Sequence, residues 1–100
     1  MINGLNLKTM AVTVRIPSVM RANTATLATV DCNGQTVGEV IDDLVRQHSA
    51  IGGVLFDGEK NLHKYVNMYL DSDDIRYIGG LEAPIGEAKE LTILPAVAGG

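Results

Sequence analysis

The sequence predicts an α+β fold in which a mixed sheet carries one main helix packed on one of its faces. Several short segments alternate between apolar and polar residues, as half-buried strands do. One longer segment has apolar residues at helical spacing and a capping motif at its start. These elements follow one another as β-β-α-β-β-β, and a helix packed on one face of a sheet buries the apolar surfaces of both.

Two strands are predicted before the helix. Residues 11–16 (AVTVRI) alternate aliphatic residues with polar ones, which is typical of a strand with one buried face. Pro17 is expected to end this strand because proline lacks the N–H group that a sheet requires. Residues 26–31 (TLATVD) predict a second, weaker strand from their β-branched residues. The pair Asn33-Gly34 then predicts a turn into the helix.

The main helix is predicted over residues 36–49. Thr36 and Glu39 fit a capping box, in which each side chain satisfies an unpaired N–H group at the helix start. Gly52-Gly53 follows soon afterwards and is expected to stop the helix. One stripe at helical spacing should face the sheet, with His48 at its edge as a boundary residue. The residues of this stripe are Val37, Val40, Ile41, Leu44 and Val45.

The remaining chain predicts a loop and three strands. Residues 51–64 are expected to form loop and short turns, and polar turns are expected at residues 71–74 and at Gly79-Gly80. Pro95 should end the final strand. The three expected strands are residues 65–70, 75–78 and 91–94.

The length of 100 residues is enough for one domain and too short for two. We expect a flexible extension at residues 1–10, one domain at 11–95 and a mobile tail at 96–100. The hydrophobic fraction of 46% and the charged fraction of 20% exclude a disordered chain. The domain is expected to be a monomer when free.

The net charge of −4 argues against nucleic-acid binding, because phosphate recognition needs a cluster of basic residues and the eight here are scattered. Cys32 is the only cysteine, so an intrachain disulfide is excluded and a reducing compartment is favoured. The first residues do not resemble a signal peptide, and no apolar stretch is long enough to span a bilayer. We therefore expect a cytoplasmic protein that binds neither membranes nor nucleic acid.

The last five residues are the strongest functional candidate. They carry no charge and little bulk, and the glycine pair has a permissive backbone, so the segment could pass through a narrow channel of a partner enzyme. From Pro95 onward the extended reach is about 17 Å. The alternative is an ordinary frayed terminus. The residues concerned are Ala96, Val97, Ala98, Gly99 and Gly100, with the carboxylate of Gly100 as the reactive group.

Other candidates favour structural roles. Cys32 could relay a persulfide, but no nearby base would lower its pKa. His48 and His63 lack the spacing of a metal site, and no metal site is expected. The turn at residues 71–74 has aspartates as calcium loops do, without the required glycine and distal glutamate. The tyrosines at positions 65, 69 and 77 leave two possibilities equally open, a docking face or cross-strand packing.

Three segments of the chain resemble the ThiS/MoaD-like sulfur carriers, a family with the ubiquitin-like β-grasp fold. They are VRIPSVMR (14–21), YVNMYLDSDDIRYIGGL (65–81) and LTILPAVAGG (91–100). The resemblance covers residues 11–100 and is strongest to actinobacterial carriers that supply cysteine synthesis. Residues 85–90 (IGEAKE) depart from the Asp-Gly-Asp-like turn that is common at this point in the family.

The resemblance implies a carrier rather than an enzyme, with no bound cofactor. An E1-like adenylating enzyme would activate the Gly100 carboxylate with Mg-ATP, and a sulfur donor would displace AMP to leave a thiocarboxylate. A biosynthetic enzyme would then accept the sulfide, in the synthesis of cysteine, thiamin, molybdopterin or another metabolite. Activation is chemically necessary because a carboxylate anion is a poor acyl donor. Two alternatives stay open: a ubiquitin-like modifier joined to lysines through Gly100, and an interaction subunit without chemistry.

Overall fold

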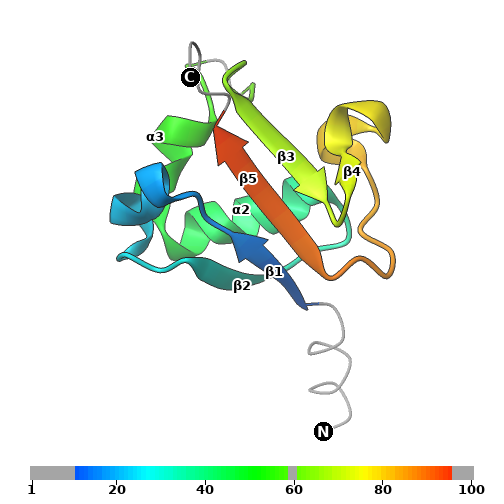
Figure 1. Ribbon diagram of the computed structural model, residues 1–100, viewed down its shortest axis with the longest axis horizontal. Coiled ribbons are helices and arrows are strands. Elements are labelled where there is room, and N and C mark those ends of the chain that lie inside the picture. The colour runs from blue at the N-terminus through cyan, green and yellow to red at the C-terminus, as the bar shows by residue number, and fades with distance from the viewer. Residues whose placement is uncertain (1–10, 59–60, 96–100) are drawn as a thin grey trace, which may run out of the picture.

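The computed structural model describes residues 11–58 and 61–95, and within them five strands form one mixed sheet with a long helix packed behind it (Figure 1). This confirms the predicted α+β architecture. The expected extension at residues 1–10 and tail at 96–100 lie outside the described residues. The strands are β1 (Ala11–Arg15), β2 (Thr29–Asn33), β3 (Val66–Leu70), β4 (Asp73–Asp74) and β5 (Glu90–Pro95).

The last strand in the sequence lies at the centre of the sheet. The strand order is β2-β1-β5-β3-β4, so β5 is inserted between β1 and β3. It runs parallel to β1, with Leu91 opposite Val14, and antiparallel to β3, with Leu91 also opposite Leu70. β1 and β2 form an antiparallel pair. Both neighbours of β5 must therefore be in place before the C-terminal strand is fully paired.

Helix α2 (Val37–Gln47) begins where the sequence predicts. The Thr36 hydroxyl accepts a hydrogen bond from the Glu39 amide at 3.1 Å. The Glu39 carboxylate accepts one in return from the amide of Gln35 at 2.9 Å, one residue earlier than in a standard capping box. None of the helices in the described part of the chain has the length and hydrophobicity needed to cross a bilayer.

The core lies between the apolar stripe of α2 and one face of the sheet. Val45, predicted for the same stripe, and His48, predicted at its edge, are only partly buried. Because the inward residues of strands and helix are spaced as the sequence predicts, one apolar layer is shared by both elements. The buried residues of this layer include Val12, Val14, Val37, Val40, Ile41, Leu44, Val66, Met68, Leu70, Leu91 and Ile93.

Two side chains of α2 cover the outer edge of β2. The amide of Asn33 donates to the Asp43 carboxylate at 2.8 Å, and the Gln47 side chain donates to the carbonyl of Asp31 at 3.0 Å. Partial burial acts to raise the pKa of Asp43, but hydrogen bonds from Asn33, Arg46 and Gln47 outweigh it and hold that pKa below its usual value. The edge strand is thereby shielded from pairing with another chain.

The second strand begins three residues later than predicted. Residues 18–24 form a 3₁₀ helix, η1 (Ser18–Thr24), and Ala25 and Thr26 adopt left-handed backbone angles with φ of 55° and 65°. The cause is Thr24, whose side chain is fully buried and hydrogen-bonds to the carbonyls of Arg21 and Leu27. This local network overrides the β-propensity of the segment that follows.

The segment after α2 is more helical than predicted. The expected loop contains η2 (Ser49–Ile51) and a short helix α3 (Gly52–Leu55), so the glycine pair begins a helix instead of only ending one. Ile51 and Leu55 are completely buried, and this burial holds the turns against the core.

The strand predicted at residues 75–78 is wrong. Only Asp73 and Asp74 pair with β3, and the chain then forms η3 (Ile75–Tyr77). The Asp74 carboxylate caps η3 by accepting from the amide of Arg76 at 2.9 Å, which favours a turn over an extended strand. Gly79 and Gly80, with φ of 124° and 64°, make the expected turn into η4 (Gly80–Glu82).

Replacing Ile41 with aspartate should unfold the domain or destabilise it by several kcal/mol, because the new carboxylate would lie unpaired in the core. Chemical denaturation followed by circular dichroism measures the loss. Ile41→Val is the matched control and should cost about 1 kcal/mol. An aspartate variant that unfolds at the same denaturant concentration as the parent would show that α2 does not pack on the sheet through this residue.

Candidate functional site

The residues predicted to act chemically, Ala96 to Gly100, lie outside the described residues. The prediction that they form a mobile tail therefore stays a prediction. The structure does describe β5, which ends at Pro95 and leads directly into them. The position of the candidate site is therefore set by β5, the central strand that precedes this segment.

β5 is paired with β1 over its first half, from Glu90 to Thr92, and with β3 from Leu91 to its end. Its register with β3 extends to Pro95, which lies opposite Val66. Leu91 and Ile93 point into the core and are essentially unexposed, whereas Leu94 points the other way and is 43% exposed. A strand hydrogen-bonded on both sides and buried on one face is among the most stable parts of a small domain. The C-terminal segment therefore leaves from a rigid support.

The start of β5 is held by Asp71, which follows β3. Its carboxylate accepts hydrogen bonds from the amides of Lys89 and Glu90 at 3.2 and 3.1 Å. Its own amide donates to the carbonyl of Glu90 at 2.8 Å. Asp71 has a φ of 52°, in the left-handed region that aspartate tolerates better than most residues. One residue thus joins the end of β3 to the beginning of β5.

The acidic turn at residues 71–74 therefore has structural roles. Asp71 anchors β5 and Asp74 caps η3 and pairs with Arg76 at 2.7 Å. Within residues 11–58 and 61–95, no group of three potential ligand side chains is placed to hold a metal ion. His48 and His63, the other residues weighed as ligands, are both half-buried, one at the end of α2 and the other just after the bridge between Phe56 and Leu62.

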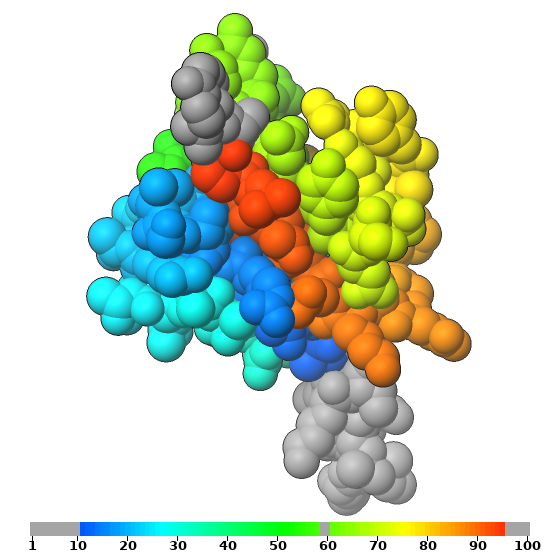
Figure 2. All heavy atoms as spheres, in the orientation of Figure 1, coloured from blue at the N-terminus to red at the C-terminus, as the bar shows by residue number. Residues whose placement is uncertain are grey.

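Beside β5, one face of the sheet is not covered by any other described element. Figure 2 shows the side chains of β5 between those of β1 and β3 on this face, with no helix over them. Where β5 approaches η1, a hollow of about 200 Å³ is lined by side chains that include Arg15, Arg21, Thr92 and Leu94. Val19 is 69% exposed on the same helical turn. This surface adjoins the point at which the C-terminal segment leaves the domain.

The two arginines of this hollow are held differently. Arg15 forms an ion pair with Glu90 across the face of the sheet. Arg21 donates from Nε to the carbonyl of Ile16 at 3.1 Å, and none of the described carboxylates pairs with it. The hollow therefore combines apolar surface with an unneutralised guanidinium. Sequence reasoning missed it because Arg21 and Leu94 are far apart in the chain.

The tyrosines divide between the two roles that the sequence left open. Tyr69 lies half-buried on the outer face of β3, opposite Thr92, and so takes part in cross-strand packing. Tyr65 and Tyr77 are 54% and 83% exposed, with Lys64 and Arg76 over their respective rings. These two rings are accessible to a partner.

Cys32 is unsuited to sulfur relay. It lies on β2 with its side chain completely buried in the core. Desolvation, followed by the nearby negative charges of Asp43 and Asp31, raises the pKa of the thiol to about 12. The reactive form of cysteine is the thiolate, so at neutral pH this side chain is an inert part of the core.

Comparisons with known proteins match nearly the whole chain. The model of the ThiS family matches residues 14–100. The sulfur carrier protein CysO of Mycobacterium tuberculosis is 43% identical over 93 residues, which are 91% of this chain and all of that protein.

Solved structures extend the comparison to the fold. A chain in the crystal structure of the BexX/CysO complex of Amycolatopsis orientalis has a TM-score of 0.82 and 46% identity, covering 90% of this chain and all of that one. The small archaeal modifier protein 1 of Methanosarcina acetivorans has a TM-score of 0.75 and 27% identity, covering 90% of this chain and 96% of that one.

The anchor at Asp71 can be tested by substitution. Asp71→Ala should lower the free energy of unfolding by about 2 kcal/mol. The substitution removes two hydrogen bonds to the start of β5, and it places alanine at a positive φ that aspartate tolerates better. Asp71→Gly relieves the backbone strain but not the lost bonds, so its stability should fall between alanine and the parent.

Asp71→Asn keeps an acceptor oxygen and should stay close to the parent. Urea denaturation of the parent and the three variants measures the order of their free energies of unfolding. A glycine variant as stable as the parent would show that the carboxylate does not hold β5. An alanine variant as stable as the asparagine variant would show that neither the side-chain hydrogen bonds nor the tolerance of a positive φ contributes to stability.

Proposed function

The chain belongs to the ThiS family, and we propose that it is a sulfur carrier whose reactive group is the α-carboxylate of Gly100. The observation that carries this proposal is the extent of the family match, which runs from residue 14 through Gly100 and so includes the glycine pair. The identity of 43% to a sulfur carrier along that protein's whole length supports the same assignment.

The proposed chemistry takes place in partner enzymes. The carboxylate of Gly100 attacks the α-phosphorus of Mg-ATP in an E1-like adenylating enzyme, which releases pyrophosphate and leaves an acyl-adenylate. A persulfide then attacks the acyl carbon and displaces AMP, and a thiol cleaves the resulting acyl disulfide to leave a thiocarboxylate. Adenylation is needed because it replaces a poor leaving group with a good one. A biosynthetic enzyme accepts the sulfide, and we propose cysteine synthesis as its destination.

The described domain would act as the holder of the reactive segment. Its central strand fixes the starting point of residues 96–100, and the uncovered face beside Leu94 offers a partner apolar surface with the Arg21 guanidinium. A CysO of Amycolatopsis orientalis forms a complex with BexX, which supports the proposal that this chain also binds a partner protein. The buried thiol of Cys32 leaves Gly100 as the group on which the sulfur would be carried.

A ubiquitin-like modifier is the second candidate function. The likeness that favours it is the small archaeal modifier protein 1, at 27% identity. The higher identity to sulfur carriers, 43% and 46%, places the carrier first. Both functions begin with activation of the same carboxylate, so their products distinguish them: a thiocarboxylate in one case and lysine conjugates in the other.

The proposal predicts a defined change in mass. Incubation with an E1-like activating enzyme, Mg-ATP and a sulfur donor should exchange one oxygen of the chain for sulfur, and peptide mass spectrometry should locate that exchange at Gly100. A variant with one alanine added after Gly100 moves the carboxylate by roughly 3.5 Å. Because a displacement near 1 Å can already cost about a hundredfold in rate, this variant should remain unsulfurated.

Thermal unfolding provides the control, since the extended variant should melt with the parent. Equal sulfuration of the two proteins, or a label on Cys32, would overturn the carrier mechanism. Lysine conjugates without the oxygen-to-sulfur exchange would replace it with the modifier function.

A further inference from the structure

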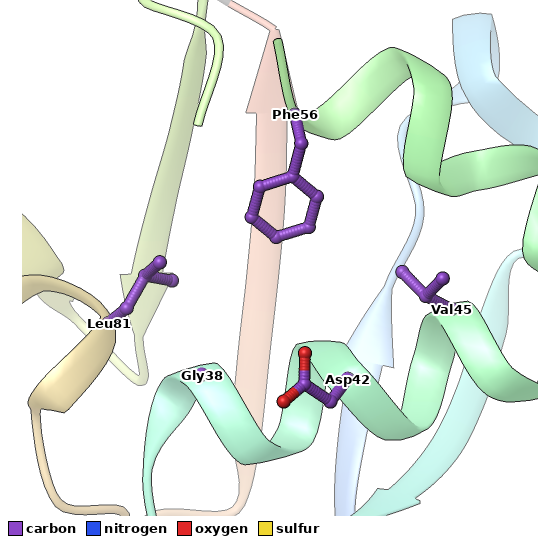
Figure 3. Close-up of a pocket in the computed structure, with 5 residues that line it drawn as sticks. All are labelled: Gly38, Asp42, Val45, Phe56 and Leu81. Carbon is purple, nitrogen blue, oxygen red and sulfur yellow. The ribbon is translucent and has the colours of Figure 1, made fainter. Parts of the chain in front are cut away.

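A second hollow lies on the helix side of the domain, away from the uncovered sheet face (Figure 3). Its volume is about 470 Å³. Three lining residues come from α2, one follows α3 and one belongs to η4. These are Gly38, Asp42, Val45, Phe56 and Leu81.

The sequence keeps this hollow open. Gly38 and Asp42 are four residues apart and Val45 three further on, so they form a second stripe of α2 beside the one that faces the core. A Cβ at Gly38 would lie 3.0 Å from the carbonyl oxygen of Leu81, so glycine allows η4 to approach the helix. Phe56, the only phenylalanine of the chain, is half-buried at the rim.

Among the described residues, Asp42 is the one charged residue that lines the hollow, and its carboxylate has no partner there. Arg46 lies four residues along the helix, which is a favourable spacing for an ion pair with Asp42. Its guanidinium instead binds Asp43, at 3.0 Å. Asp42 forms neither a hydrogen bond nor an ion pair with any residue that the structure describes. In Figure 3 its oxygens point into the space between Gly38 and Phe56.

We propose that this hollow binds an arginine side chain from a partner protein, flanked by apolar residues. A guanidinium presents a planar pair of donors that suits a carboxylate, here that of Asp42. The same group stacks favourably on an aromatic ring, here that of Phe56. Val45 and Leu81 supply apolar surface for the methylene stem and for a neighbouring aliphatic residue.

The charge around the hollow favours a cationic occupant. Glu39 adjoins Gly38 on α2 and Glu82 follows Leu81, while Arg46, which follows Val45, is paired with Asp43. None of the described residues that line the hollow is basic. A partner that carries arginine is therefore attracted, and an acidic one is repelled. This complementarity matches the net charge of −4 for the whole chain.

The shape favours a protein surface over a small molecule. Each of the five lining residues is at least partly exposed, so the hollow is open to solvent. Pockets for small molecules usually enclose most of the ligand. The hollow also lies on the other side of the sheet from Leu94, so a protein bound here would leave the root of the C-terminal segment accessible.

Amide chemical shifts of the ¹⁵N-labelled chain test the proposal, with acetyl-Leu-Arg-Leu-amide as the probe. Saturable shifts should appear at Gly38, Asp42, Val45, Phe56 and Leu81. The same peptide with citrulline, a neutral isostere of arginine, should bind about fivefold more weakly, since an exposed ion pair and a cation–π contact contribute about 0.5–1 kcal/mol each. Asp42→Asn removes the ion pair but keeps the contact with Phe56, so it should weaken binding of the arginine peptide by about two- to threefold, whereas Asp73→Asn, an equal charge change away from the hollow, should not.

Each other outcome overturns the proposal. Equal binding of the citrulline peptide, or of the parent and Asp42→Asn, would show that the hollow does not recognise arginine. Shifts confined to β5 and η1 would place the peptide on the uncovered sheet face. Arginine amide that binds as tightly as the peptide would show that the hollow binds a small cation. An absence of chemical-shift changes at millimolar peptide would show that the hollow does not bind arginine side chains.

Discussion

The insertion of β5 between β1 and β3 is the constraint on which the rest of the structure depends. The last strand of the chain is also the centre of the sheet, paired with β1 over its first half and with β3 to its end. Its inward residues Leu91 and Ile93 meet the apolar stripe of α2, and Asp71 ties its first residue to the end of β3. The same contacts that stabilise the fold therefore fix the point from which residues 96–100 depart.

The two faces of the sheet consequently have different roles. The inner face is covered by α2 and forms the core, where Cys32 is a buried and unreactive thiol. The outer face stays open around Leu94, beside the root of the C-terminal segment. The hollow at Asp42 lies on the helix side of the sheet, between α2, Phe56 and η4. If the chain acts as the proposed carrier, this separation would let a partner bind at the hollow while the end of β5 stays accessible.

Local patterns in the sequence predicted most of the fold. Alternation gave β1, β3 and β5, and the pair Thr36 and Glu39 gave the start of α2. Two errors arose where hydrogen bonds from a side chain to the nearby backbone override β-propensity, at Thr24 before β2 and at Asp74 before η3. Both hollows escaped prediction for a different reason. Their residues meet only in the folded chain, so their spacing in the sequence carries no signal.

Native-state hydrogen exchange along β5 tests most directly whether the strand that leads into residues 96–100 is a rigid support. The account predicts that the amides of Leu91 and Ile93 exchange only through global unfolding, with the same dependence on denaturant as those of Ile41 and Leu44 in α2. Exchange of the β5 amides through local openings that are insensitive to denaturant, while α2 remains protected, would contradict it.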